Sequence, residues 1–300
     1  MGVFRVAQLL EPKVGNSASM QGEKTAEERS FRRGDFDMRF VINRPHGHMR
    51  IMDYRSGNYA DKCALLDRLA QTEGLRKVFT VVEKQDSKNW RSAGFVREAV
   101  YPSFFRTADA YMMSRIYAKG GEPVAELLPL KPSADEQIRF PGRKLQKPAG
   151  FSLSTIEDEG SRKELVSKAN GDLRALPFSR VAAPDMVVHC RAKGGKNAWA
   201  CAETNDSFGH ASVGFAPAPK NDEQMVLSAY AGNCLIEQLI ARQVANIFSV
   251  SPTDDELANQ LLFGLGFKVT GRLIDHLMTN GEHANALLWH RRLIEPVVRT

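Results

Sequence analysis

One pattern of apolar and polar positions occurs twice in this chain. A short apolar strand is followed by a polar helical stretch, then by Gly-Phe and a long run of alternating apolar residues. In the first copy the strand is 77–82 and the dipeptide is Gly94-Phe95, and in the second they are 245–250 and Gly266-Phe267. Self-similarity on this scale indicates a repeated structural unit.

The same periodicities predict the other elements. Two-residue alternation on both sides of the turn-forming residues 45–48 predicts a hairpin, and helical spacing after it predicts a helix that Gly74 ends. Asn221 and Gln224 have the spacing of a capping box at a helix start. In the second half, strands are expected at 152–155, 186–192, 198–204 and 210–215, and helices at 157–173 and 222–243.

Turn-forming residues divide the chain into modules. Residues 1–35 mix glycine, serine and charged side chains, which is typical of a flexible arm. Five prolines and four glycines between 119 and 150 exclude a long regular element, so 121–150 is interpreted as a linker. It separates a module at 36–120 from a module at 151–295. The expected fold class is α/β (α+β), with mixed central sheets flanked by helices.

Composition narrows the class of protein. Of the 300 residues, 43% are hydrophobic, which is enough for two cores. The formal charge of +6 is spread along the chain without a clustered basic face, so no nucleic-acid partner is expected. No apolar run reaches the about 20 residues of a membrane span, and a cytoplasmic protein without a membrane partner is predicted.

Cysteine and histidine usage argues against a metal or disulfide framework. The four cysteines lack paired spacing, which is typical of reduced thiols. His189, Cys190, Cys201 and His210 are residue types that zinc prefers, but their spacing matches no zinc motif. No metal is therefore expected.

The order of these elements, with Leu265-Gly266-Phe267 directly after the last helix, resembles the GNAT superfamily of acyl-CoA-dependent N-acyltransferases. Within it the chain is most similar to the beta-lysine N6-acetyltransferases, which carry a partial N-terminal copy before a full acyltransferase module. The resemblance implies a tandem GNAT-like fold and acetyl transfer from acetyl-CoA to a primary amine of a lysine-type small molecule. The resembling segments are 46–52, 77–79, 94–99 with Tyr101-Pro102, 200–203, 266–267, 271–274 and 288–289.

The resemblance places the CoA pyrophosphate at the turn after strand 210–215. Such a site uses backbone N–H groups at a helix N-terminus, usually in a loop with glycine. This chain has Ala-Pro-Ala-Pro there, followed by Asp222 and Glu223, so the pyrophosphate loop is degenerate. Asn259 lies on the helix beside the pantetheine arm, and Phe263 takes the place of a tyrosine that could protonate the thiolate. The candidate cofactor-binding residues are Lys220, Asn221, Gln224, Met225, Asn259 and Phe263.

Acetyl transfer needs a base that keeps the attacking amine neutral. Glu203 at one strand end and His210 at the start of the next strand are the candidate catalytic residues, although a strand-end carboxylate is more often a solvated surface charge. Two function classes remain open. The first is an amine N-acyltransferase with acetyl-CoA as co-substrate. The second is a catalytically inactive GNAT-fold module that binds a protein partner or a second copy of this chain.

Overall fold

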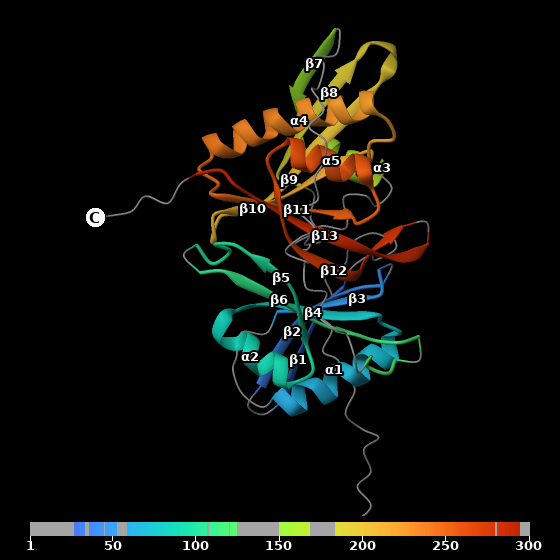
Figure 1. Ribbon diagram of the computed structural model, residues 1–300, viewed down its shortest axis with the longest axis vertical. Helices are drawn as coiled ribbons and strands as arrows, with labels where there is room; N and C mark the ends of the chain where they lie inside the picture. The colour runs from blue at the N-terminus through green and yellow to red at the C-terminus, as the bar shows by residue number, and fades with distance from the viewer. Residues whose placement is uncertain are drawn as a thin grey trace, which may run out of the picture.

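The computed structural model describes residues 27–33, 36–44, 46–52, 59–106, 108–119, 121–124, 150–168, 184–279 and 281–294. These residues form one mixed sheet of 13 strands, in the order β1-β2-β3-β4-β6-β5-β12-β13-β11-β10-β9-β8-β7. Helices α1 and α2 lie at one end of the molecule, and α4 and α5 lie at the other (Figure 1).

The elements follow the chain order that the sequence predicts. The helices are α1 (Tyr59–Glu73), α2 (Lys84–Ser92), α3 (Glu159–Lys168), α4 (Asp222–Ala241) and α5 (Glu256–Gly264). The strands are β1 (Glu27–Arg33), β2 (Phe36–Asn43), β3 (His48–Ile51), β4 (Lys77–Glu83), β5 (Val96–Tyr101), β6 (Ala110–Ile116), β7 (Phe151–Thr155), β8 (Met186–Ala192), β9 (Asn197–Asn205), β10 (His210–Ala216), β11 (Asn246–Pro252), β12 (Lys268–Thr279) and β13 (Glu282–Arg292). The predicted linker lies mostly outside the described residues, as does the predicted end of the helix at 169–173.

Strand β1 corrects the predicted N-terminal arm, which was expected to extend to residue 35. Residues 27–33 instead pair antiparallel with β2 at one edge of the sheet. Their many charges are typical of a solvated segment, but Arg29 contacts Glu27 at 2.8 Å and Glu73 at 2.7 Å. Arg44 contacts the same two carboxylates. Partners distant in the sequence thus stabilise this strand, and residues 1–26 lie outside the described residues.

The two halves of the sheet repeat one pairing order. In the N-terminal half (27–124), β3 is parallel to β4, and β4, β6 and β5 follow in antiparallel pairs. In the C-terminal half (150–294), β10, β11, β13 and β12 pair in the same way. The halves join where β5 meets β12 antiparallel, with Ala99 opposite Gly271. These two residues follow Gly94 and Gly266 at equal distance, so equivalent positions pair, as across a local two-fold axis.

The three largest clusters of buried side chains among the described residues stabilise the sheet. One packs beneath α1 and α2, and another packs beneath α4 and α5. The third joins the two halves and includes Phe79, Tyr101 and Phe104 from one half with Phe248 and Leu288 from the other. Burial of one such side chain contributes about 1.5–3 kcal/mol. The halves therefore share a hydrophobic core along the β5–β12 junction.

Candidate functional site

The start of α4 is the predicted pyrophosphate turn, and its own side chains cap it. Asn221 Oδ1 accepts a hydrogen bond from the Gln224 N–H at 2.9 Å, and Gln224 Oε1 accepts one from the Lys220 N–H at 2.8 Å. The predicted capping role of Asn221 is confirmed, whereas Gln224 bonds the N–H of Lys220, the residue before the cap, and not that of Asn221. Met225 is buried in the core beneath α4, and its N–H bonds the Asn221 carbonyl. The backbone N–H groups of Lys220, Gln224 and Met225 at this turn are thus already bonded.

Charge at the same turn also disfavours a polyanion. Asp222 and Glu223 occupy the first turn of α4, where carboxylates suit the positive end of the helix dipole. Glu223 pairs with Lys196 at 2.5 Å, and both side chains are about half exposed. The helix dipole is therefore balanced by residues of the chain itself.

Replacing Asn221 with alanine should lower the free energy of unfolding by about 1 kcal/mol, because the Gln224 N–H loses its acceptor. Chemical denaturation of the two proteins measures this difference. Asn221→Ser retains a capping oxygen and serves as the control, with stability close to that of the parent. Equal stability of the alanine and parent proteins would show that the cap contributes nothing.

The predicted pantetheine residues lie on α5 and differ in exposure. Asn259 is 3% exposed, and its Oδ1 accepts a hydrogen bond from the Ser251 hydroxyl at 2.5 Å. Its Nδ2 donates to two backbone carbonyls of the β11–α5 connection, and the Trp289 indole donates to the same Ser251 hydroxyl. Asn259 therefore connects α5 to β11. Phe263, by contrast, is 45% exposed on the outer side of α5.

The predicted base candidates lie on neighbouring strands. Glu203 on β9 is opposite Ser212 of β10, and His210 is two residues before Ser212, so the structure places both side chains on one face of the sheet. His210 is 1% exposed, and burial lowers its pKa to about 4, so its imidazole is neutral at pH 7. The Phe104 ring lies over it, with 4.3 Å between ring centroids. A substrate amine would have to displace that ring.

Strands β10 and β11 pair over only three residues, from His210 opposite Asn246 to Ser212 opposite Phe248. Beyond that point the Ser249 hydroxyl donates to the Val213 carbonyl at 2.8 Å, so the two strands remain bridged where regular pairing ends. The N-terminal half has the same contact between β4 and β3. There the Thr80 hydroxyl donates to the Ile51 carbonyl at 3.3 Å.

Sequence reasoning missed a buried polar group at the junction of the halves. The Lys77 ammonium lies 2.7 Å from a Glu98 carboxylate oxygen, with side chains 0% and 2% exposed. His48 and His276 stack beside this pair, with 5.4 Å between their ring centroids. The repeat held a signal for His276. This histidine follows Gly266 at the same distance as Phe104 follows Gly94, so it stands where the other copy has a phenylalanine.

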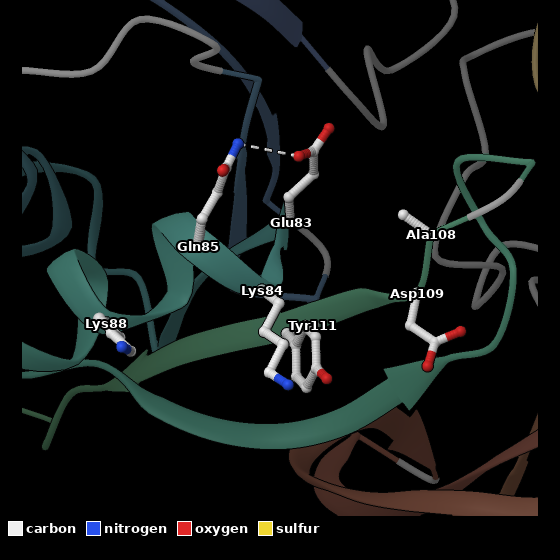
Figure 2. Close-up of a pocket in the computed structure, with 7 residues that line it drawn as sticks. All are labelled: Glu83, Lys84, Gln85, Lys88, Ala108, Asp109 and Tyr111. Atoms are coloured by element: carbon white, nitrogen blue, oxygen red, sulfur yellow. Dashed lines mark hydrogen bonds between the residues drawn. The ribbon is translucent and has the colours of Figure 1, made fainter.

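A shallow pocket with a volume of about 500 Å³ lies on the N-terminal half (Figure 2). All of its lining residues except Tyr111 are exposed, and its charges have both signs. None of the predicted site residues lines it. The lining residues are Glu83, Lys84, Gln85, Lys88, Ala108, Asp109 and Tyr111.

Within the described part of the chain, no group of three or more histidine, cysteine, aspartate or glutamate side chains is arranged to hold a metal ion. The four cysteines are free thiols. No helix among the described residues is long and apolar enough to span a membrane.

No protein-family model and no curated protein matches the chain. Among solved structures, the ribosomal-protein-S18-alanine N-acetyltransferase from Escherichia coli is 13% identical, with 50% of this chain and 98% of that chain covered, at a TM-score of 0.36. A putative acetyltransferase from Salmonella typhimurium, solved with acetyl-CoA, has the same identity and coverage at a TM-score of 0.38. The Vibrio cholerae spermidine/spermine N-acetyltransferase is 11% identical over 48% of this chain and 95% of its own, at a TM-score of 0.37. This likeness of fold over about half the chain is too weak to carry an argument about activity.

Proposed function

We propose that this chain is a duplicated GNAT-type fold that serves as a binding or assembly module and not as a CoA-dependent enzyme. The C-terminal half supplies the full copy, since its elements β7-α3-β8-β9-β10-α4-β11-α5-β12-β13 have the order that the sequence resemblance implies. The N-terminal half repeats that pairing order from β2 to β6. A protein partner or a second copy of this chain is the proposed binding partner.

The observation that carries this proposal is that side chains of the chain itself cover the region where β10 and β11 stop pairing. In the fold that the chain resembles, the cofactor arm would lie between these strands, with its pyrophosphate at the start of α4. Here the Ser249 hydroxyl bridges the strands, and Phe104 covers His210. On the helix side, Phe215 and Leu265 pack so close to Gly232 that a methyl group there would lie 2.9 Å from each side chain. These contacts support the proposal, because each uses side chains of the chain itself where the resemblance places a cofactor arm.

The second candidate function is an acetyl-CoA-dependent N-acyltransferase that acts on a small-molecule amine. The early end of β10–β11 pairing favours it, because both strands extend four residues beyond their last paired position. Glu203 or His210 would then be the base, and Asn259 and the α4 turn would contact the cofactor. For this function Phe104 would have to move away from His210.

A thermal shift titration with acetyl-CoA should leave the melting temperature unchanged up to millimolar concentration. A specific site filled at 100 times its dissociation constant would add about 2.7 kcal/mol of stability. The double variant Asp222→Gly, Glu223→Gly removes two negative charges from the α4 turn and is the matched comparison. A shift in the parent that grows in the double variant would locate the cofactor at that turn, overturn the proposal and favour the enzyme.

A further inference from the structure

In each half of the molecule, one aromatic or imidazole ring packs against a histidine of the other half. Ser103 and Asp275 both have positive φ, 51° and 47°, which aims the next residue across the junction. Phe104 then stacks on His210 with ring centroids 4.3 Å apart and planes at 31°. His276 stacks on His48 at 5.4 Å, also with planes at 31°. We call the His276–His48 contact the N-terminal contact and the Phe104–His210 contact the C-terminal contact.

The two contacts have the same interplanar angle but different chemistry. At the C-terminal contact, Phe248 and Phe208 surround the Phe104–His210 pair, and Arg50 is the charged group whose field reaches His210. At the N-terminal contact, both stacked rings are imidazoles. The charged and titratable groups that face them are His46, Arg76, Lys77, Glu98, Asp275 and His283.

Four polar contacts hold the N-terminal contact closed. His48 Nε2 donates to the Asp275 carbonyl at 2.8 Å, and Arg76 contacts the Asp275 carboxylate at 3.3 Å. Lys77 Nζ donates to the Ile274 carbonyl at 2.6 Å, and the Ile274 N–H donates to Glu98 at 2.9 Å. All four bonds end on Ile274 or Asp275, where the register of β12 against β13 is interrupted.

Protonation of the stacked imidazoles opposes this closed arrangement. Burial holds the pKa of His48 and of His276 well below its ordinary value, and the nearby Lys77 ammonium lowers it further. When the contact opens, each ring regains a pKa of about 6.5. The open state therefore binds more protons, so the closed contact is fully stable above that pH and weakens as the pH falls below it.

We propose that the N-terminal contact is an acid-sensitive switch: protonation of His48 and His276 releases residues 274–276 from the N-terminal half before the rest of the fold opens. Release moves residues 274–276 of β12 away from β3 and β4. It exposes Phe79 on the side of the sheet that faces away from α1 and α2. The proposal does not depend on whether the chain binds CoA.

Hydrogen exchange at two equivalent amides tests the switch. The Asp275 N–H bonds Asn285 Oδ1 at 3.0 Å, and the Ser103 N–H bonds Asp109 Oδ1 at 2.8 Å. Between pH 7.5 and 5.5, each histidine that protonates on opening changes the opening equilibrium about tenfold. After correction for intrinsic exchange, protection at Asp275 should fall about hundredfold and protection at Ser103 about tenfold. An equal fall at both amides would mean general unfolding and would overturn the proposal.

Matched variants are obtained by giving each of the equivalent positions 276 and 104 the residue that the other position has. His276→Phe copies the residue that the other half has at this position, and should reduce the fall at Asp275 to about tenfold. Phe104→His makes the reverse change and should increase the fall at Ser103 to about hundredfold. If one variant fails to fold, the other still decides the question. An unchanged pH dependence in the folded variant contradicts the switch.

Discussion

Replacing Gly271 with alanine should lower the free energy of unfolding by about 3 kcal/mol, because overpacking of a close contact is destabilising. A methyl group at this position would lie 2.2 Å from the Ala99 Cβ and 2.8 Å from the Glu98 carbonyl oxygen. Both neighbours belong to β5, so the added methyl group would force apart the strand pair that, among the described residues, joins the two halves of the sheet. Urea denaturation followed by circular dichroism measures the loss.

The same substitution elsewhere provides the control. Gly264 lies at the end of α5 with no atom within 4 Å of an added Cβ, so Gly264→Ala should leave stability equal or higher by about 0.5–1 kcal/mol. The double variant Ala99→Gly, Gly271→Ala moves the methyl group to the opposite strand. It should recover part of the stability lost in Gly271→Ala. No recovery would show that contact with the β5 backbone dominates, at the residue 99 Cα 2.5 Å away and the Glu98 carbonyl oxygen 2.8 Å away. A stable Gly271→Ala protein would contradict the close approach itself.

Replacing Lys77 with methionine should lower the free energy of unfolding by about 3–5 kcal/mol, because it leaves the Glu98 carboxylate buried without its cation. Glu98 would retain hydrogen bonds from the Ser114 hydroxyl and the Ile274 N–H, which do not neutralise its charge. Denaturant titration of Lys77→Met, Glu98→Gln and the double variant gives the coupling energy between the two side chains.

The double variant should be more stable than the sum of the two single losses predicts, since glutamine needs no counterion. The exposed pair of Lys196 and Glu223 is the matched control, and Lys196→Met should cost less than about 1 kcal/mol. Strictly additive losses at Lys77 and Glu98 would mean that the two charges do not stabilise one another.

Local features of the sequence predicted most of the elements. Alternation and helical spacing gave the strands and helices of the C-terminal half in their observed order, and Asn221 caps α4 as its spacing with Gln224 indicates. Strand β1 was missed because its charged residues have no apolar periodicity, and its partners Arg44 and Glu73 lie far along the chain. A strand stabilised by such distant ion pairs has little local signature.

The candidate site depended much more on tertiary structure. The sequence identified His210 and Asn259 as polar residues near a cofactor path, but not that Phe104 covers the first or that Ser251 binds the second. Both facts follow from contacts between segments that are separate in the sequence. The pairing of Ala99 with Gly271 sets which residues of the two halves meet.

The sequence by itself determined the repeated pattern, the order of its elements and the Ala-Pro-Ala-Pro stretch before α4, because each of these is encoded by residues close together in the chain. Only the tertiary structure decided that the two units share one sheet and that each covers a histidine of the other. The physical reason is that burial, and the pKa values it shifts, depend on packing between the halves. Packing at this junction is set by the close approach of two strands at Gly271.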